Sequence, residues 1–234
     1  MNDKPVMIIT GTRKGIGKYL AEYFSEKGFF VIGCSRKGAD IQLNNYHHHC
    51  LDISDESSVK KMFTSIRKEY GRLDVLINNA GANYTLSPVV LVPFESALKT
   101  IMVNFMGTFL FSREAIKIMK LNTFGRIINF GSMATKHEVK GEAIYTASKA
   151  ATASFTRVLA KEVYSYGIIC NVISPSAIDT DLMKNVKIDE LKEVLSRNAI
   201  PEIGRLEDIS NTIDWLIKSE NIAITGQTIF LGGV

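Results

Sequence analysis

Apolar residues along the chain fall into two recurring patterns. Short, continuously apolar runs are typical of strands that are buried on both faces of a parallel sheet. The stretches between them place apolar residues three or four positions apart, as in helices that pack one face against such a sheet. Because the two patterns alternate, the sequence predicts an α/β fold with a doubly wound sheet. The expected strands are residues 6–10, 29–33, 46–52, 75–78, 125–130, 168–173 and 226–231, and the main expected helices are residues 16–27, 54–70, 94–120, 143–166 and 208–218.

Length and composition favour a single domain that spans residues 1–234. The chain is 46% hydrophobic and 22% charged, which is ordinary for a globular protein, and no Pro/Gly/Ser-rich linker or block of charge divides it. The net charge of +4 comes from scattered Lys and Arg residues, so no nucleic acid is expected as a partner. No apolar run reaches the ~20 residues of a membrane span, and no signal peptide precedes the first strand. We therefore expect a cytoplasmic protein without a membrane partner.

A glycine-rich turn follows the first expected strand and leads directly into a helix. Glycines let the backbone turn tightly and approach a pyrophosphate, whose charge would face the positive end of the helix. Strand, turn and helix therefore stand in the order that a dinucleotide-binding site requires. The residues of this turn that are expected to contact the cofactor are Gly11, Arg13, Lys14, Gly15, Ile16 and Gly17.

The end of the second strand is expected to meet the adenosine ribose of such a cofactor. An Asp or Glu there would accept a hydrogen bond from a 2′-hydroxyl, whereas an Arg would pair with a 2′-phosphate. The chain has Ser35 and Arg36 at this place and no acidic residue before Asp40. Arg13 and Lys14 can approach from the glycine-rich turn. These residues favour NADP(H) over NAD(H); the competing interpretation is that Arg36 belongs to a solvated loop.

Three consecutive histidines, residues 47–49, raise the question of a metal site in the third expected strand. Successive side chains of a strand point to opposite faces, so the three imidazoles cannot converge on one ion. The three cysteines also lack the spacing of metal ligands or disulfides, and we expect no metal. Asp52 and Ile53 end the strand, where the carboxylate could accept a hydrogen bond from an adenine amino group.

Small and polar residues follow the fourth and fifth expected strands. Asn79, Ala80 and Gly81 stand at the end of a central strand, where a cofactor lies against backbone, and are expected to contact it. Ser132 stands just after the fifth strand. Asn104 lies inside an expected helix although Asn is a poor interior helix residue. Its side chain either has another task or is a tolerated polar position.

Tyr145 and Lys149 are the candidates for proton transfer. Residues four apart lie on one face of a helix, so the ammonium group would lie near the phenol and lower its pKa from ~10. Such a Tyr can give a proton to a carbonyl oxygen or take one from a hydroxyl. The loop that separates Ser132 from Tyr145 is long enough for the two hydroxyls to bracket one carbonyl oxygen. Alone, a Tyr–Lys pair usually decorates a surface; the motifs that precede this pair favour catalysis.

Taken in order, these motifs resemble the short-chain dehydrogenase/reductase family over nearly the whole chain, including members of the 3-oxoacyl-carrier-protein reductase type. The resemblance implies a single Rossmann-type domain, with a seven-stranded parallel sheet and helices on both faces. The motifs that carry it are Thr10-Gly11-x-x-x-Gly15-x-Gly17, Asn78-Asn79-Ala80-Gly81, Asn104, Ser132, Tyr145-x-x-x-Lys149 and the final Gly226-Gln227.

The resemblance also implies a role for each catalytic candidate. Tyr145 would be the general acid/base, and Lys149 would lower its pKa and hold the nicotinamide ribose. Ser132 would hydrogen-bond the substrate oxygen, while Asn104 would support a water that links Lys149 to solvent. The physics agrees, because charge that develops on the substrate oxygen would meet the Ser132 and Tyr145 hydroxyls.

Further cofactor contacts follow from the family pattern. Residues 79–81 would line the adenosine ribose side, and Thr180 would reach the pyrophosphate or the carboxamide. Pro175 and Ile178 would contact the cofactor after the sixth strand. Ser176 stands where the family commonly has Gly, so a side chain occupies a place where backbone often approaches the nicotinamide.

The sequence thus predicts an NADP(H)-dependent oxidoreductase that interconverts a ketone and a secondary alcohol. One alternative is an NAD(H)-preferring dehydrogenase of the same family. Another is a non-catalytic NADP(H)-binding sensor, which would be expected to have lost part of the Ser–Tyr–Lys set. The loops expected to choose the substrate (82–93, 134–142 and 181–200) demand no particular chemical group.

Two further expectations concern the charge of the substrate and the assembly of the protein. Lys136, His137 and Lys140 could attract an acidic substrate, although they could equally be solvated surface. The family also implies a homotetramer, or at least a homodimer, in which helices 94–120 and 143–166 pack against their symmetry mates.

Overall fold

The computed structural model describes residues 4–178 and 188–233, which build around one seven-stranded sheet. The strands are β1 (Val6–Thr10), β2 (Phe30–Ser35), β3 (Tyr46–Cys50), β4 (Val75–Asn78), β5 (Gly125–Phe130), β6 (Ile168–Ser174) and β7 (Thr228–Phe230). All neighbouring strands pair in parallel, in the order β3-β2-β1-β4-β5-β6-β7. The chain winds outward from β1 to β3 and then crosses back to β4, so the winding direction reverses between β1 and β4. The predicted seven-stranded parallel sheet is confirmed.

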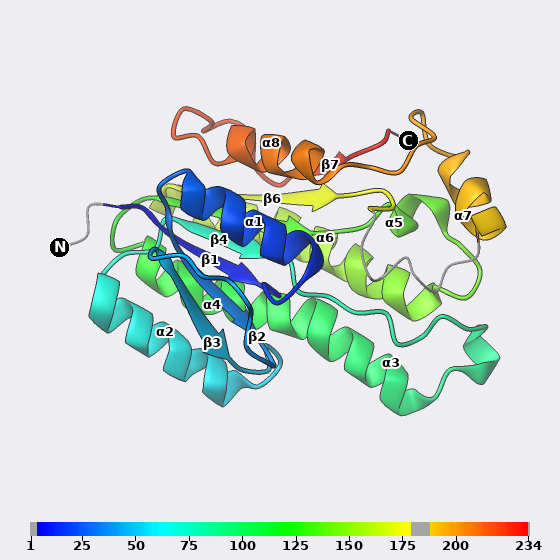
Figure 1. Ribbon diagram of the computed structural model, residues 1–234, viewed down its shortest axis with the longest axis horizontal. Helices are drawn as coiled ribbons and strands as arrows, with labels where there is room; N and C mark the ends of the chain where they lie inside the picture. Colours follow the sequence, from blue (N-terminus) through cyan, green and yellow to red (C-terminus); the bar gives the residue numbers. More distant parts are fainter. Residues whose placement is uncertain (1–3, 179–187, 234) are drawn as a thin grey trace.

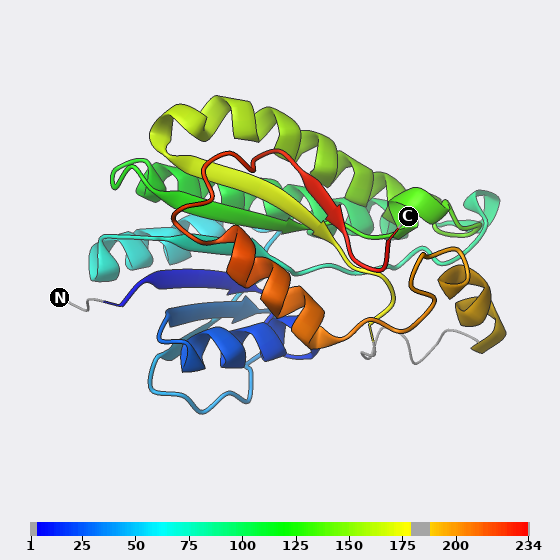
Figure 2. The ribbon, with the colours of Figure 1, turned by 90° about the horizontal axis from the view of Figure 1, so that it is seen from above.

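Helices cover both faces of this sheet, as predicted. On one face lie α1 (Gly15–Glu26) and α8 (Leu206–Leu216), and on the other lie α2 (Glu56–Tyr70), α4 (Gly107–Met119) and α6 (Ala143–Val163). Figure 1 and the perpendicular view in Figure 2 show the strands between these two helical layers.

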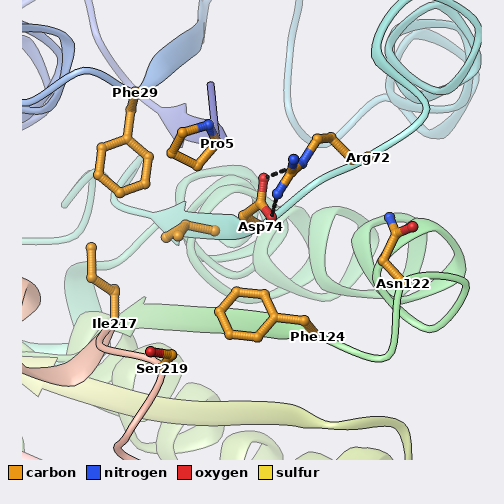
Figure 3. A pocket seen from close by; sticks show the side chains of 9 residues that line it. Pro5, Phe29, Arg72, Asp74, Asn122, Phe124, Ile217 and Ser219 are labelled. Carbon is orange, nitrogen blue, oxygen red and sulfur yellow. Dashed lines mark hydrogen bonds and ion pairs between the residues drawn. The ribbon is translucent and has the colours of Figure 1, made fainter. Parts of the chain in front are cut away.

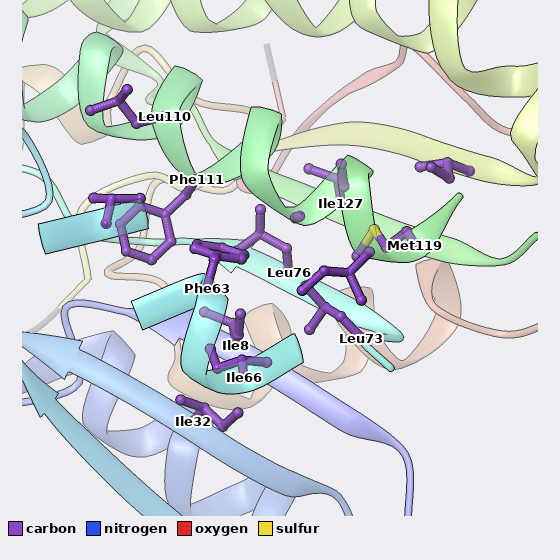
Figure 4. Packing of buried hydrophobic residues seen from close by; sticks show 14 of the residues in the cluster. Ile8, Ile32, Phe63, Ile66, Leu73, Leu76, Leu110, Phe111, Met119 and Ile127 are labelled. Carbon is purple, nitrogen blue, oxygen red and sulfur yellow. The ribbon is translucent and has the colours of Figure 1, made fainter. Parts of the chain in front are cut away.

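The alternation of side chains along each strand supplies a core to both layers. Ile8 of β1 packs towards α2 and α4, whereas its neighbours Met7 and Ile9 pack towards α1 and α8. Figure 4 shows the first of these cores, where Phe63 of α2 meets Phe111 of α4 above the strands. The two rings make an edge-to-face contact with centroids 5.4 Å apart. A continuously apolar strand is therefore required because both of its faces are buried.

The expected helix over residues 94–120 is not one continuous α-helix, which corrects that prediction. It consists of α3 (Phe94–Ile101), a π-helical turn η2 (Met102–Met106) and α4. The expected helix over 143–166 is confirmed, although its last turn is the 3₁₀-helix η3 (Tyr164–Tyr166).

Some segments expected to be loops contain helix. These are α5 (Ala134–His137), α7 (Ile188–Leu195) and the 3₁₀-helix η1 (Val89–Leu91). Conversely, β3 ends two residues earlier than predicted, and β7 is only three residues long. Short elements such as these carry too few residues for a periodic pattern.

The carboxyl ends of the strands gather at one edge of the molecule. In Figure 1 the arrowheads of β1 and β6 point to the right, towards α5 and α7. The turns that follow β1, β2, β4 and β5 therefore lie on the side where ligands bind in doubly wound sheets. The chain enters β1 from the opposite side.

Candidate active site

The glycine-rich turn after β1 has the geometry that its sequence predicts. Gly11 and Gly15 adopt φ values of +78° and +59°, which favour glycine. A Cβ on Gly17 would collide with the Gly11 carbonyl oxygen, so the start of α1 packs directly on the strand exit. No side chain caps the first turn of α1, and that turn contains no acidic residue. The positive end of the helix thus faces the turn without a carboxylate to neutralise it.

The segment after β4 is fastened to this turn. Asn79 Nδ2 donates to the Thr10 carbonyl oxygen (2.8 Å), and the Ala80 amide donates to Thr10 Oγ1 (2.9 Å). A Cβ on Gly11 would lie 3.0 Å from the Ala80 Cα. The structure therefore brings residues 79–80 beside the glycine-rich turn. Thr10 holds them there through two hydrogen bonds that the sequence did not predict.

The end of β2 lies against the same turn. The amides of Gly11 and Thr12 both donate to the Cys34 carbonyl oxygen, at 2.8 and 3.3 Å. Ser35 follows at once and is half-buried, and Arg36 is exposed. Arg13 and Lys14 are exposed on the turn itself, and Ile16 is half-buried behind them. The basic residues expected near a 2′-phosphate thus border one place on the surface.

The two residues expected near adenine have structural tasks. Asp52 Oδ1 accepts hydrogen bonds from the Ser54 amide (2.9 Å) and the Ser54 hydroxyl (2.6 Å), so it shapes the turn that leads into α2. The Ile53 side chain is buried and packs on α4, where a Cβ on Gly107 would lie 2.6 Å from Ile53 Cδ1. A contact between Ile53 and a cofactor would therefore come from its backbone.

Ser132 and Tyr145 meet across the end of β5. The Ser132 side chain lies close enough to the Tyr145 hydroxyl to act on its pKa, and Ser132 Oγ accepts from the Ala134 amide at 3.1 Å. Tyr145 reaches this place from the first turn of α6, and Ser132 from the turn before α5. The two hydroxyls that the sequence proposed as a bracket are thus adjacent.

Lys149 does not act on Tyr145 as the sequence suggested. Its ammonium donates to the Phe130 carbonyl oxygen at 2.9 Å and lies 5.9 Å from the Tyr145 ring centroid. Burial raises the pKa of Tyr145, and the nearby Ser132 and Glu142 side chains act in smaller, opposite directions. The expected lowering of the Tyr145 pKa by Lys149 is therefore wrong for this structure, because burial dominates and the ammonium is turned to a backbone carbonyl. Burial also lowers the pKa of Lys149 itself, to about 8.

Asn104 fastens the π-helical turn to the loop after β4. Its Oδ1 accepts from the Ala82 amide (2.8 Å), and its Nδ2 donates to the Ala82 carbonyl oxygen (2.9 Å) and to Ser148 Oγ (3.0 Å). A Cβ on Gly81 would lie 3.3 Å from Lys149 Nζ and 3.4 Å from Asn104 Oδ1. Asn104, Gly81 and Lys149 therefore converge at one point beside the carboxyl ends of β4 and β5.

The segment after β6 lies across the site from α6. The Pro175 carbonyl oxygen accepts from the Met133 amide at 3.2 Å, which ties this segment to the turn that carries Ser132. Ser176 Oγ accepts from Asn198 Nδ2 at 2.8 Å, so the side chain that replaces the family's Gly is held towards Asn198. The Ile178 side chain is buried in the core of the α1 and α8 layer. Thr180 lies outside the described residues.

Basic residues expected near the substrate have partners of their own. His137 Nε2 hydrogen-bonds Asn198 Oδ1 at 2.8 Å, and Lys136 Nζ lies 5.1 Å from the centroid of the Phe230 ring. Lys136 and Lys140 are exposed. The sequence missed Glu142, which accepts from Asn83 Nδ2 at 3.4 Å; burial raises the pKa of its carboxyl group.

A cavity of about 430 Å³ lies at the opposite edge of the sheet, near the amino ends of the strands. Figure 3 shows Phe29 and Phe124 across it, with the ion pair between Arg72 and Asp74 at its rim. This cavity is remote from Tyr145.

In residues 4–178 and 188–233 no group of three or more His, Cys, Asp or Glu side chains could hold a metal ion. Within the same residues no helix is long and apolar enough to cross a membrane.

Comparison with known proteins decides the family. Residues 5–191 match the family model described as short chain dehydrogenase. The chain belongs to the short-chain dehydrogenase/reductase family. It is therefore an oxidoreductase of the class that acts on hydroxyl and keto groups.

Curated relatives match over nearly their whole length. The chain is 31% identical to the 3-oxoacyl-[acyl-carrier-protein] reductase FabG of Escherichia coli (strain K12), over 97% of this chain and 96% of that protein. It is 33% identical to the enzyme of the same name from Buchnera aphidicola subsp. Schizaphis graminum, over 99% of this chain and 97% of that protein.

Solved structures of the family have the same fold. The structure of ElxO with NADP bound superposes with a TM-score of 0.89 at 28% identity, over 97% of each chain. A variant of the actinorhodin polyketide ketoreductase with NADPH gives a TM-score of 0.88 at 24% identity, over 100% of this chain and 97% of that one. At that identity the second match shows the fold alone.

Proposed function

We propose that this protein is an NADP(H)-dependent ketoreductase, which interconverts a ketone and a secondary alcohol with Tyr145 as general acid/base. The observation that carries the proposal is the proximity of the Ser132 and Tyr145 side chains, with the buried Lys149 one helical turn away. Two hydroxyls that lie close together at the carboxyl ends of the strands can together hold one substrate oxygen.

The residues around this pair fit a nicotinamide cofactor. Gly11 and Gly17 have no side chains, and a Cβ at either position would crowd neighbouring atoms. The backbone amides between β1 and α1 are therefore not covered by side chains of these two residues, and a phosphate can approach them. The adjoining surface carries Arg13, Lys14 and Arg36, and no acidic residue lies between the end of β2 and Asp40. A 2′-phosphate would meet cations there, which supports NADP(H) over NAD(H). The relatives named as 3-oxoacyl-[acyl-carrier-protein] reductases support the reduction of a ketone, and the NADP-bound ElxO structure supports the choice of cofactor.

The chemistry divides between cofactor and protein. A bound nicotinamide supplies the hydride. Ser132 and Tyr145 orient the substrate carbonyl by hydrogen bonds to its oxygen, and Tyr145 gives its proton to that oxygen as charge develops there. Tyr145 can do this because burial raises its pKa and keeps the phenol protonated. In the reverse direction, the Lys149 ammonium would stabilise the phenolate if it turned from the Phe130 carbonyl towards Tyr145.

A substitution at Tyr145 tests the acid/base role. We expect Tyr145→Phe to lower kcat for NADPH-dependent ketone reduction about 100-fold or more, because general acid catalysis typically contributes 10²–10⁴-fold. The measurement is NADPH oxidation with a panel of ketones that includes acyl thioesters. NADPH affinity, from fluorescence titration, should stay within about threefold of wild type.

Tyr164→Phe is the matched control, because Tyr164 is exposed at the far end of α6. It should retain full turnover. A Tyr145→Phe enzyme with undiminished turnover would remove Tyr145 from the mechanism. A wild-type protein that binds NADPH but turns over no ketone or alcohol in the panel would favour the sensor, and tighter binding of NADH would favour the NAD(H) dehydrogenase.

A further inference from the structure

One histidine of the run at residues 47–49 joins three segments of the cofactor edge. His48 lies on β3, and its imidazole Nδ1 lies 2.7 Å from the Tyr46 hydroxyl and 3.4 Å from Thr12 Oγ1. On the other side of the ring, Nε2 lies 3.1 Å from Ser35 Oγ and 3.1 Å from the Lys37 carbonyl oxygen. The ring therefore links the glycine-rich turn, β3 and the segment that follows β2.

The hydrogen bonds define which nitrogen carries the proton. Burial raises the pKa of Tyr46 to about 12, so its phenol keeps its proton and can donate to His48 Nδ1. Nε2 must then be the donor, since the Lys37 carbonyl can only accept. Burial lowers the pKa of His48, which favours this neutral form of the ring. Every polar atom of the imidazole thus has a defined partner.

The backbone is shaped to admit this network. Thr12 Oγ1 and the Tyr46 hydroxyl lie 2.8 Å apart in the space above Gly33 of β2. A Cβ on Gly33 would collide with both oxygens. Glycine at this strand position therefore makes room for the Tyr46–Thr12 pair, and the pair in turn supports the imidazole of His48.

The other end of the network holds the segment expected to meet a 2′-phosphate. Ser35 Oγ donates to the Lys37 carbonyl oxygen, and both atoms are hydrogen-bonded by His48 Nε2. These bonds close residues 35–37 into a tight turn, and Arg36 is the exposed residue at its centre. The direction of the Arg36 backbone is thus fixed by a side chain from the neighbouring strand.

We propose that His48 is a positioning residue for cofactor selectivity, which holds the Ser35–Lys37 turn so that Arg36 faces the 2′-phosphate of NADP(H). The inference rests on the proposed NADP(H) binding. Its physical basis is that a preformed turn spares the ordering cost that a mobile Arg36 would incur on binding. NADH has no 2′-phosphate, so its affinity should not depend on the turn.

Substitution of His48 should therefore change one cofactor and not the other. We expect His48→Leu, which removes both nitrogens, to weaken NADPH binding about tenfold, the effect of losing two hydrogen bonds that order the turn. NADH affinity should stay within about twofold of wild type. His48→Gln, whose amide can replace the donor near Nε2, should lose less NADPH affinity than His48→Leu. Both cofactors are titrated by fluorescence on the full chain, with adenosine 2′,5′-bisphosphate and AMP as competing probes.

His47 provides the matched control, because it is the adjacent histidine on the same strand and is exposed. Its ring packs against His49, with centroids 4.7 Å apart. His47→Leu should change neither affinity. Unchanged NADPH affinity in His48→Leu, or an equal loss for NADPH and NADH, overturns the inference. A wild-type protein without NADPH preference overturns the proposed cofactor as well, and the wild-type titration alone identifies that case.

Discussion

A lysine in a buried site is a compromise between catalysis and stability. Lys149 is 4% exposed, and the Phe130 carbonyl oxygen is the acceptor for its ammonium group. Removing the charge from water is costly, so burial lowers the pKa of Lys149 to about 8. A proposed role beside an anionic phenolate or a ribose explains why the chain retains a charge at a position where an apolar residue would be more stable.

This compromise predicts how folding stability depends on pH. The pKa of Lys149 is about 8 in the folded protein and 10.5 for an unburied lysine, as in the unfolded chain. Between these values the unfolded state binds more protons, so stability contributed by this site rises with pH. We expect the difference in unfolding free energy between wild type and Lys149→Met to shift in favour of wild type by about 2–3 kcal/mol from pH 7 to pH 10.

Urea unfolding at several pH values measures this shift. Lys161→Met is the control, because Lys161 is an exposed lysine of the same helix and its removal should leave a curve parallel to wild type. Parallel curves for wild type and Lys149→Met would show that burial does not perturb the lysine.

The sequence indicated which residues form the candidate site better than it indicated which atoms those residues contact. Gly11, Ser132 and Tyr145 could be proposed from the sequence because each residue type suits one chemical task at the end of a strand. The partner of Lys149 could not, because the Phe130 carbonyl is a backbone group that carries no signature in the sequence. The bridging role of His48 was hidden for the same reason, since its partners come from segments that only the sheet brings together.

At the scale of elements, the π-helical turn η2 is the main departure from the predicted pattern. A single π turn shifts the helical register over residues 94–120 too little for periodicity to reveal it. The indication was Asn104, an unfavourable residue in a helix interior. In the wider π-helical turn the Asn104 side chain makes three hydrogen bonds, two with the Ala82 backbone and one with Ser148 Oγ.

These bonds predict a large effect of removing one side chain. Asn104 is 1% exposed, so Asn104→Ala would leave the amide and carbonyl of Ala82 without their partners. We expect the free energy of unfolding to fall by about 2–4 kcal/mol, from two or more unsatisfied polar groups at about 1–3 kcal/mol each. The measurement is urea denaturation at neutral pH.

An asparagine in another helix gives the comparison. Asn211 is exposed within α8, so Asn211→Ala should change stability by no more than about 0.5 kcal/mol and in the stabilising direction, because Ala is the better helix former. If Asn104→Ala were as mild as Asn211→Ala, the side chain would not fasten the loop after β4.

For the whole molecule, the sequence predicted a parallel, doubly wound sheet with helices on both faces. Buried apolar runs that alternate with amphipathic helices allow few arrangements, because crossovers are right-handed and parallel strands must be covered on both faces. This places the ends of β1, β2, β4 and β5 at one edge, and with them the motifs that follow each strand. The cavity between Phe29 and Phe124 could not be foreseen, since it forms where loops at the other edge fail to fill the space.

The outer surface of the helical layer predicts assembly. Phe94 and Leu98 of α3 are 76% and 44% exposed, and Val158 of α6 is 54% exposed. Phe155, by contrast, turns inward and makes an edge-to-face contact with Phe105, so α6 divides its apolar residues between the core and the surface. Apolar side chains that stay exposed on two adjacent long helices suit a contact between copies of the chain. We expect a homotetramer, or at least a homodimer, in solution at micromolar concentration.

A charge placed on this surface should weaken the contact. We expect Val158→Glu to lower the mass measured by light scattering towards that of a smaller assembly or a monomer, because symmetry brings each new carboxylate close to a second copy and buries it. Leu121→Glu is the control, since Leu121 is 57% exposed and lies after α4, outside the two segments expected to pair (94–120 and 143–166). It should leave the mass unchanged. A wild-type protein that is monomeric under these conditions would contradict the assembly, and an unchanged mass for Val158→Glu would move the contact away from α6.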